Sequence, residues 1–336
     1  MSDIDVAVII VTYKSAKLTV DCLRSIETER STPGIQIRAI VVDNASGDAP
    51  HIEKAIGENG WSSWVTLLSA SKNGGFAYGN NVGIEHAYRI YPPDYVHLLN
   101  PDTVVRAGAI VTLVHFLQTH PDVGIAGSGL EDSAGRHSPI AFRFPSILSE
   151  LDAGLQFGLV THLLRPWIVA KHMTTVPQAI DWIPGASMML RREVLDTIGG
   201  LDENYFLYFE ETDFCFRAKL AGFPTWYVPE SRVMHITGQS TQVTNCKAKP
   251  TRLPGYWFES RRRYFSVTSG VGYAMAVDVV ALIAHGLGTL KRIALGRSDR
   301  GIPHYMGDLA RHSPLHRANR KLPGNGARRF QSPTGI

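Results

Sequence analysis

The chain has 336 residues, 44% of them hydrophobic and 19% charged, which is an ordinary globular composition with enough apolar residues for a sizeable core. This length predicts one large domain with an appendage, or two domains. The three cysteines, at positions 22, 215 and 246, form no CxxC pair, which excludes a zinc ribbon and a disulfide framework and fits a reducing compartment.

The net charge of +4 is unevenly distributed along the chain. From residue 251 onward, 14 Lys and Arg residues stand against four acidic ones, so this part carries +10 and residues 1–250 carry −6. A basic segment attracts anionic surfaces, either membrane lipid or nucleic acid. An acidic domain that binds a phosphate ligand must supply a compensating cation.

The N-terminus has too short an apolar run for a signal peptide. Six apolar residues, VAVIIV, follow Ser2, Asp3 and Asp5. We therefore expect the body of the protein to stay in the cytosol.

Residues 6–117 alternate between short apolar runs and helical periodicity, a pattern that is typical of βαβ units and a mostly parallel sheet. The expected strands are VAVIIVTY (6–13), IRAIVVDNAS (37–46), WVTLLSAS (64–71) and DYVHLLNPD (94–102). Each of these strands ends in polar residues. Open α/β sheets bind ligands beyond the carboxyl ends of their strands, so the sequence predicts a crevice lined by Thr12, Asp43, Asn73 and Asp102.

Residues 130–180 are punctuated by Pro and Gly and poorly periodic, which predicts an insertion or a mobile loop. Beyond residue 180 the pattern changes. WIPGASMMLRREVL (182–195) predicts a strand followed by a helix, EETDFCFRAKLAG (210–222) a helix, and TWYVPESRVMHI (225–236) an extended segment. We interpret this part as the second half of the same domain, devoted to a second substrate.

Residues 267–290 are strongly apolar, with Asp278 and His285 inside the run. A membrane-spanning helix needs about 20 apolar residues, and a carboxylate near its middle costs about 2.5–3.5 kcal/mol, which disfavours a span. Two alternatives stay open: a helix that packs on the domain or pairs with another subunit, and a helix at a membrane interface. Basic residues at 261–263 and 291–292 favour contact with anionic lipid. The last thirty or so residues, rich in Pro, Gly, Arg and His, predict a loosely ordered tail.

Two of the strand-end segments have an ordinary structural explanation as well as a functional one. Asp43 and Asn44 can bind a base or a ribose, and they are also common turn residues. The segment SKNGGFAYGNNVGI (71–84) allows a backbone to approach a ligand closely, or caps a helix that begins near Asn80. It lacks the GxGxxG spacing and the lysine of a phosphate loop, so dinucleotide binding and NTPase activity lose support.

Three other segments carry carboxylate or imidazole groups that suit metal binding and proton transfer. Asp102 of LLNPDTVV can hold a divalent cation against a diphosphate, although an NPD sequence is also a common turn. Glu210, Glu211 and Asp213 open a predicted helix, where the helix dipole favours acids, but three acids among aromatic residues exceed what capping needs. Partial burial would raise a carboxyl pKa towards the range of a general base. His235 precedes a polar, Gly-containing loop and is expected to face a site.

Together, these segments resemble family 2 glycosyltransferases with a GT-A fold, in the branch that includes bacterial rhamnosyltransferases and galactofuranosyltransferases. The segments that carry the resemblance follow the family's order over about residues 6–240: VIIVTYKS, IVVDNASGD, NGGFAYGNNVGI, LLNPDTVV, WIPGASMMLRREVLDTIGGLDENYFLYFEETDFCFR and VMHITGQST. The resemblance implies an α/β fold with a Rossmann-like, mostly parallel sheet of the nucleotide-diphospho-sugar transferase type. It also implies a GT-A domain at 1–250, with a nucleotide-binding half at 1–125 and an acceptor and catalytic half at 180–250. A basic C-terminal helical extension at 251–336 would follow.

The resemblance also implies roles for single residues. Glu211 matches the position of the catalytic base, where the family usually has Asp. Asp102 stands at the last position of the DxD-type motif, whose first acidic position is Asn100 here, and His235 matches a histidine that completes the metal site. The donor is expected to contact Thr12, Tyr13, Asp43, Asn44, Asn73, Gly75, Phe76, Asn81, Asn100 and Asp102. The acceptor is expected to contact Trp182, Gly185, Ala186, Glu210 and Asp213.

The implied reaction is inverting transfer of a sugar from a nucleotide diphosphate, with Mg²⁺ or Mn²⁺ as cofactor. L-rhamnose from dTDP-rhamnose is the first choice on resemblance, and UDP-galactofuranose and UDP-hexose donors are the alternatives. The alternative outside the enzymes is a non-catalytic scaffold that binds a nucleotide sugar.

The implied acceptor is a hydroxyl of a glycan or of a polyprenyl-linked glycan in cell-surface polysaccharide synthesis. The basic extension predicts peripheral contact with an anionic membrane, at the inner face of the cell membrane, and a homo-oligomer is a further alternative. Nucleic acid is not an expected partner, because the sequence contains no base-stacking or zinc module.

Overall fold

The computed structural model describes residues 3–236, 250–296 and 301–330. Within these ranges, nine strands form one sheet in the order β3-β2-β1-β4-β8-β6-β9-β5, with β7 paired to β9. The strands are β1 (Ile4–Thr12), β2 (Ile35–Asp43), β3 (Val65–Ser69), β4 (Tyr95–Leu99), β5 (Thr103–Val105), β6 (Ile125–Glu131), β7 (Gln178–Ile180), β8 (Ser187–Arg191) and β9 (Thr225–His235).

The N-terminal part of the sheet is parallel and buried on both faces. β1 pairs in parallel with β2 on one side and with β4 on the other. Helices cover both faces of such a sheet, so its strands consist of continuous apolar residues, and Val6 to Ile10 are all fully buried. The register places Thr12 opposite Asp43, so both polar ends lie at the same edge of the sheet. The mostly parallel α/β sheet expected from the sequence is confirmed.

The second half of the sheet introduces the antiparallel pairs. β8 is antiparallel to both β4 and β6, and β5 is antiparallel to β9. The last pairing brings Thr103 opposite His235, although the two residues are 132 positions apart in the chain. Segments that the sequence assigned to separate halves therefore meet at one edge of the sheet.

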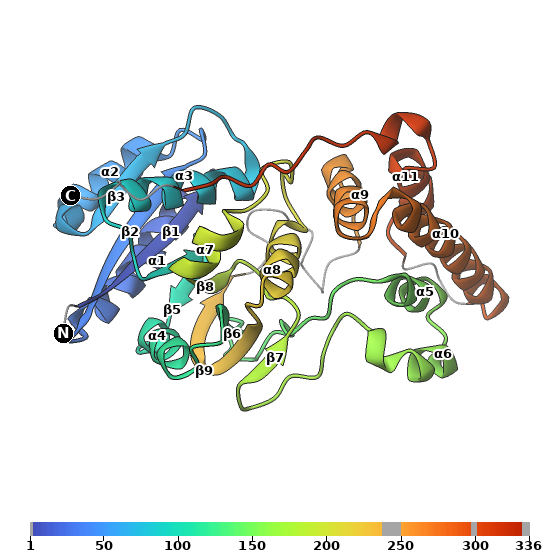
Figure 1. Cartoon of the computed structure of the whole chain (residues 1–336), viewed down its shortest axis with the longest axis horizontal. Coiled ribbons are helices and arrows are strands. Elements are labelled where there is room, and N and C mark those ends of the chain that lie inside the picture. Colours follow the sequence, from blue (N-terminus) through green and yellow to red (C-terminus); the bar gives the residue numbers. More distant parts are fainter. Residues whose placement is uncertain (1–2, 237–249, 297–300, 331–336) are drawn as a thin grey trace.

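Helices cover the sheet and form a second layer at one end of the molecule (Figure 1). They are α1 (Ala16–Glu27), α2 (Ala49–Glu58), α3 (Gly75–Ile90), α4 (Ala109–Thr119), α5 (Ile147–Leu155), α6 (Gly158–Leu163), α7 (Arg192–Ile198), α8 (Glu210–Leu220), α9 (Gly255–Ser269), α10 (Val271–Ala294) and α11 (Tyr305–His312). α3 packs against β1 and β2, and α4 packs against β6 and β9.

Most of the glycine-rich segment lies inside α3, and only residues 71–74 precede the helix. The helix begins at Gly75 and not near Asn80. A Cβ atom at Gly79 would lie 2.5 Å from the Val11 side chain, and one at Gly83 would lie 2.6 Å from that of Ile9. These two glycines are therefore needed for the close packing of α3 on β1.

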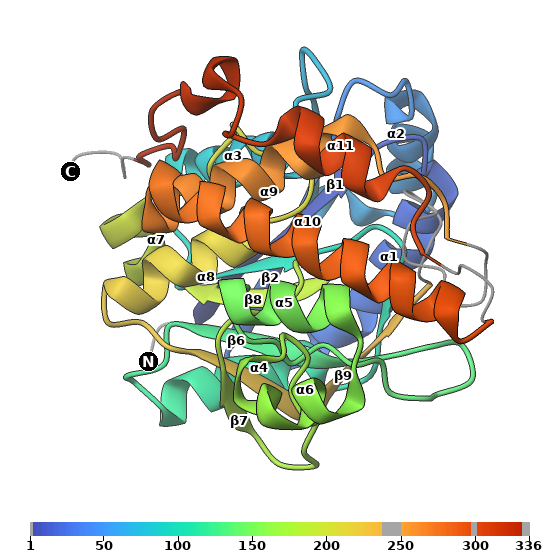
Figure 2. The same ribbon diagram turned by 90° about the vertical axis from the view of Figure 1, so that its right-hand side faces the viewer.

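Residues 130–180 and the C-terminal region together build the second layer. The apolar run at 267–290 is not one helix, because Gly270, with φ +88°, separates α9 from α10. α10 crosses one end of the molecule with α5 and α6 below it (Figure 2). The expected insertion at 130–180 thus contains two helices that complete this layer.

The described end of the chain is not the loosely ordered tail that its composition predicted. After α11 the chain runs back along the molecule to α3 (Figure 1). Ala327 forms a β-bridge with Asp202, and Phe330 packs against Tyr88 at a ring distance of 5.2 Å. Arg328 forms ion pairs with Glu203 and Glu85. These contacts with the sheet domain were invisible in the sequence because each joins residues more than 100 positions apart.

Candidate active site

The edge of the sheet at the ends of β1 and β2 contains the expected donor-binding residues Thr12, Tyr13 and Asp43. Thr12 is fully buried, and its hydroxyl lies 2.9 Å from that of Ser15. Asp43 is 3% exposed and accepts hydrogen bonds from the Ser46 N–H at 2.9 Å and the Ala49 N–H at 3.2 Å. Its carboxylate therefore holds the loop between β2 and α2. Tyr13 is 43% exposed at the same edge.

Asn44 joins this edge to the start of α3. Its side-chain amide donates to Asn73 Oδ1 at 3.1 Å and to the Gly75 carbonyl at 3.0 Å. Gly75 has φ +86°, and a Cβ atom there would lie 1.8 Å from the Phe206 carbonyl oxygen. The sequence predicted that the backbone at these glycines approaches a ligand closely. In the structure, the backbone at Gly75 closely approaches the segment before α8. It links the donor-side residues to the helix that carries the acids.

Asn81 does not belong to this group. Its side chain is fully buried, and its amide donates to the Leu201 carbonyl at 2.8 Å and to Glu203 Oε1 at 2.9 Å. Its carbonyl oxygen accepts the Leu201 N–H at 3.0 Å. All of these groups lie on the protein side of α3. Asn81 therefore fixes the 199–209 segment, whereas the sequence suggested that it contacts the donor.

Asp102 and His235 meet where β5 pairs with β9. His235 Nε2 lies 3.2 Å from Asp102 Oδ1 and 3.5 Å from Asn100 Nδ2. Asp102 is 5% exposed, and its carbonyl accepts the Ile236 N–H at 2.9 Å, which fixes the turn after β4. The polar loop expected after His235 begins at residue 237 and lies outside the described residues.

Glu211 projects from the first turn of α8 into the same region. Its carboxylate accepts the Gly185 N–H at 3.1 Å. A Cβ atom at Gly185 would lie 2.6 Å from the Phe76 ring and 3.1 Å from Glu211 Oε1, so only glycine leaves room for both side chains. Burial raises the pKa of Glu211 above that of an ordinary glutamate.

Two residues in left-handed backbone conformation precede this helix. Tyr208 has φ +71° and Phe209 has φ +68°, values that residues other than glycine rarely adopt. Such strain persists where the surrounding structure holds the chain in place, and it is concentrated at functional sites. The two residues turn the chain so that Glu210 and Glu211 begin α8 beside the cleft.

Glu210 is 1% exposed and faces the same cleft as Glu211. Its Oε2 atom has no hydrogen-bond partner among the described residues. Burial raises the pKa of Glu210 well above its ordinary value, and the neighbouring charge of Glu211 raises it further. Glu210 is therefore the acid of the pair that keeps its proton more readily.

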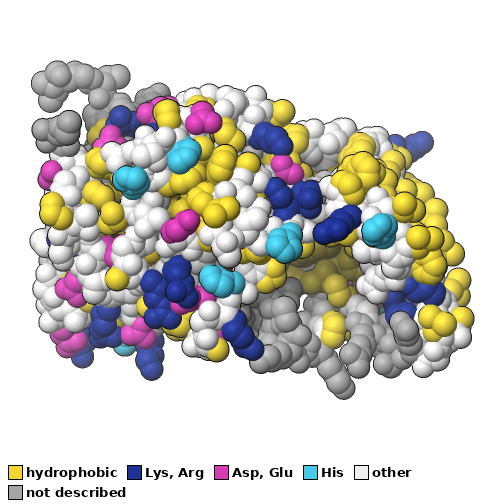
Figure 3. All heavy atoms as spheres, turned by 90° about the horizontal axis from the view of Figure 1, so that it is seen from below, with side chains coloured by type: hydrophobic (Ala, Val, Ile, Leu, Met, Phe, Trp, Pro, Cys, Tyr) yellow, Lys and Arg dark blue, Asp and Glu magenta, His cyan; other side chains and the backbone are white. Residues whose placement is uncertain are grey.

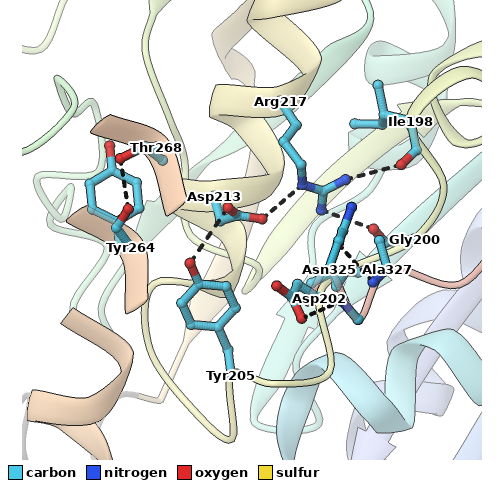
Figure 4. A network of polar contacts seen from close by, with 12 residues as sticks. Ile198, Gly200, Asp202, Tyr205, Asp213, Arg217, Tyr264, Thr268, Asn325 and Ala327 are labelled. Carbon is cyan, nitrogen blue, oxygen red and sulfur yellow. Dashed lines mark hydrogen bonds and ion pairs between the residues drawn. The ribbon is translucent and has the colours of Figure 1, made fainter. Parts of the chain in front are cut away.

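Asp213, the third acid of the cluster, points toward Arg217 and Tyr205 and is not among the residues that line the cleft (Figure 4). It accepts a hydrogen bond from Arg217 Nε at 2.8 Å and lies 3.5 Å from the Tyr205 hydroxyl. Arg217 also donates to the carbonyls of Ile198 and Gly200. This network fixes the segment between α7 and α8, so Asp213 is placed in a structural position and not at the acceptor.

A cleft of about 490 Å³ lies beside the start of α8. The expected site residues that line it are Phe76, Asn100, Asp102, Trp182, Ala186, Glu210, Glu211 and His235. The wall is largely apolar on the side of Trp182, whose ring stacks on Phe142 at 4.5 Å and whose Nε1–H donates to the Arg143 carbonyl at 3.0 Å. Thr12, Asp43 and Asn73 lie at the neighbouring strand ends and do not line this cleft.

Several lining residues were not predicted from the sequence. They are Phe142, Pro145, Val169, Pro184, Leu207, Tyr208, Phe209, Thr212 and Trp257. Trp257 comes from α9, in the C-terminal extension. The aromatic residues around Trp257 in the sequence indicate that this helix is buried, but they do not indicate which surface the helix covers. Among these residues, Tyr208 and Phe209 could have been predicted most readily, because they lie just before the predicted base in the sequence.

The metal-binding potential of the site rests on two side chains. Within residues 3–236, 250–296 and 301–330 no group of three or more Asp, Glu, His or Cys side chains is arranged to hold a metal ion. Asp102 and His235 supply one carboxylate and one imidazole, which fits a site whose other ligands come from a phosphate ligand and water.

Comparison with known proteins gives a consistent family assignment. A family model described as "Glycosyltransferase like family 2" matches residues 4–249. The chain is 30% identical over 152 residues to the N-acetylglucosaminyl-diphospho-decaprenol L-rhamnosyltransferase of Mycobacterium tuberculosis (strain CDC 1551 / Oshkosh), a match that covers 44% of the chain and 48% of the relative. It is 26% identical over 197 residues to the rhamnosyltransferase WbbL of Escherichia coli (strain K12), covering 57% of the chain and 72% of that relative. The match thus spans about half the length of the mycobacterial relative.

The fold is that of GT-A glycosyltransferases. The mannosyltransferase PcManGT from Pyrobaculum calidifontis, solved in complex with GDP-Man and Mn²⁺, superposes with a TM-score of 0.53 at 16% sequence identity. The superposition covers 92% of this chain and 79% of that one. The expected GT-A fold is confirmed.

Proposed function

The chain belongs to the glycosyltransferase-like family 2, and from this premise we propose that it transfers a sugar, with inversion, from a nucleotide diphosphate to a hydroxyl of an acceptor glycan. The observation that carries the proposal is one cleft that Glu211 lines together with the Asp102 and His235 pair. The cleft thus contains a carboxylate that can act as a base and two groups that suit a diphosphate with its metal ion.

Glu211 is the base in this proposal. Its carboxylate removes the proton of the acceptor hydroxyl, whose oxygen forms the new bond to the anomeric carbon. The bond from that carbon to the diphosphate breaks on the opposite face and leaves its electron pair on the phosphate oxygen. The Gly185 N–H orients the carboxylate, and the raised pKa of Glu211 makes it a stronger base than an exposed glutamate. Asp102 and His235 would hold Mn²⁺ or Mg²⁺, whose charge stabilises a diphosphate leaving group.

L-rhamnose from dTDP-rhamnose is the proposed donor. It is supported by the names of the two bacterial relatives, both rhamnosyltransferases. The name of the mycobacterial relative also supports a polyprenyl-linked acceptor. The apolar wall around Trp182 and Phe142 supports an acceptor with an apolar part, because such a surface gains from the burial of apolar area.

We place the reaction in a reducing compartment, at the inner face of a membrane. Cys22 and Cys215 are buried and free, which fits a cytosolic protein. A membrane location would bring the site to a lipid-linked acceptor.

The test compares three variants on a panel of nucleotide sugars. Glu211→Gln should lower transfer at least about 100-fold, since it removes the base, and should leave donor binding nearly unchanged. Glu211→Asp should retain part of the activity, because the shorter carboxylate is still a base. Asp102→Asn should show the opposite pattern, with weaker donor binding in Mn²⁺ and little further loss on chelation. Transfer is measured by release of the nucleotide diphosphate, and binding by calorimetry with Mn²⁺ or a chelator.

Full transfer by Glu211→Gln would remove this residue from the mechanism. Donor binding by the wild type without any transfer or slow hydrolysis would favour the scaffold alternative. Turnover of UDP-galactofuranose or a UDP-hexose in preference to dTDP-rhamnose would show that the proposed donor is wrong.

A further inference from the structure

The two faces of α10 differ in an unusual way. Its only acid, Asp278, lies on the inner face with five small or apolar residues, and these inner residues are Ala274, Val277, Ala281, Ala284 and Gly288. The large side chains exposed on the outer face are all aliphatic, with exposed fractions of 41 to 68%: Val279, Ile283, Leu287, Leu290 and Ile293. They recur every three or four residues, so they form one stripe along the helix. The helix therefore presents an apolar face to its surroundings.

The inner face of α10 is fixed to the rest of the protein. Asp278 forms a buried ion pair with Arg261 of α9, which also pairs with Glu150 of α5 at 2.8 Å. At Gly288 a Cβ atom would lie 2.1 Å from the Gly154 carbonyl oxygen, so α5 and α10 touch at their backbones. α10 is long and apolar enough to cross a membrane. A span would break these contacts and expose the paired charges to lipid.

A second group of exposed apolar residues continues this surface. Its members, on and beside α6, are Phe157, Leu159, Leu163 and Trp167, exposed by 45 to 65%. Lys291 of α10 lies 5.5 Å from the centre of the Phe157 ring and donates to the Leu155 carbonyl at 2.8 Å, so the two groups adjoin. We call their union the apolar end surface. Hydrophobic side chains gather over this end of the molecule (Figure 3).

Two cations adjoin the apolar end surface, and one acid beside α6, Asp152 of α5, accepts a hydrogen bond from the Thr161 hydroxyl at 2.6 Å. α6 contains no acid, and the one acid of α10 is buried against Arg261. The cations at its border include Lys291 and the exposed Arg165. Anionic lipid headgroups complement such a border, whereas a second copy of the same surface would bring like charges together. Exposed aliphatic surface of this extent on a protein marks a contact with lipid or another protein.

We propose that the apolar end surface docks on an anionic phospholipid bilayer, with α10 lying in the plane of the membrane. Its aliphatic stripe enters the boundary between headgroups and acyl chains, and the bordering cations contact the headgroups. α9 and the buried ion pairs stay on the protein side. This binding is separate from the transfer chemistry, so either proposal can fail without the other.

The test measures binding of the full chain to vesicles by flotation. Wild type should bind phosphatidylcholine vesicles that contain phosphatidylglycerol, and bind vesicles of phosphatidylcholine alone more weakly. The double variant Leu287→Gln with Leu290→Gln should bind about tenfold more weakly, because two apolar side chains no longer gain from burial. The matched control, Ile90→Gln with Leu220→Gln, changes two residues elsewhere that are exposed by 63% and 74%, and it should bind like wild type. Arg165→Gln should weaken binding to the anionic vesicles alone.

Three results would overturn the proposal. The first is equal vesicle binding by wild type and the Leu287 and Leu290 variant. The second is a wild-type dimer in light scattering that this variant abolishes, which would assign the surface to a second copy. The third is retention in the membrane after an alkaline carbonate wash, which would indicate a span. Hydrolysis of a nucleotide sugar by the double variant should equal that of wild type, which shows that its fold and active site are intact.

Discussion

Glu210 and Glu211 are neighbours in sequence, yet the structure gives them different environments. Glu211 has a backbone N–H to orient it, whereas Glu210 is buried with one oxygen unpaired within the described part of the chain. A buried carboxyl group without partners is more stable when neutral. Two neighbours in sequence are therefore one carboxylate that a backbone N–H orients and one buried carboxyl group whose pKa is raised.

Glu210→Gln should stabilise the protein, and more so at high pH. The pKa of Glu210 is raised in the native state, so between its unfolded value of about 4.3 and the raised native value the native state binds more protons. Stability then falls as pH rises through this window. The variant lacks this titration, so its melting temperature should exceed that of wild type by more at about pH 8 than at about pH 5.

Thermal unfolding at both pH values measures this effect. Glu53→Gln, at an exposed position of α2, is the control and should leave the difference between the two pH values unchanged. A destabilised Glu210→Gln at the higher pH would show that the carboxylate is held charged.

At the scale of elements, the end of the chain holds the segment that leads into α8. Arg263 of α9 forms a buried ion pair with Asp202 and donates to the Pro323 and Gly324 carbonyls at 2.9 Å. Asp202 in turn accepts the Gly326 N–H at 3.1 Å. One ion pair therefore joins three parts of the chain: the 199–209 segment, α9 and the residues after α11.

Arg263→Met should destabilise the protein strongly. Removing one partner of a buried ion pair leaves the other charge uncompensated and costs about 3–5 kcal/mol. Urea unfolding measures the loss, and Arg263→Lys should recover part of it because the charge remains. Arg136→Met breaks an exposed pair with Asp132 and should change stability little. An equal effect of the two Met variants would show that the Arg263 contacts are not needed.

At the scale of the whole molecule, the division at residue 250 does not separate two cores. Tyr205 packs in one buried cluster with Tyr264, Phe265, Ala274 and Val277 of α9 and α10. The same division crosses the cleft, because Trp257 of α9 lines it together with residues before position 250. A site shared in this way depends on both parts being folded.

We expect a single cooperative unfolding transition. Elements that share buried contacts unfold together, whereas an extension with its own core would unfold separately. Near-ultraviolet circular dichroism, which reports on the aromatic cluster, should follow the same urea curve as the far-ultraviolet signal from the helices and the sheet. Two separate curves would support an independent extension after residue 250.

The sequence by itself determined the first four strands up to Asp102, the polar ends of these strands and the acids at the start of α8. These are local properties: apolar periodicity sets the type of an element, and parallel strands bring their carboxyl ends to one edge. Thr12, Asp43 and Asp102 could be assigned to that edge on this basis alone.

The tertiary structure decided which of these residues face the cleft. Asp213 lies two positions after Glu211, a rotation of about 200° around the helix, so it turns inward to Arg217 while Glu211 faces the cleft. Asn81 and the residues after α11 were likewise assigned only by contacts across more than 100 positions. Local sequence patterns do not predict such contacts, because the contacts form only when distant segments pack together and bury their polar groups against one another.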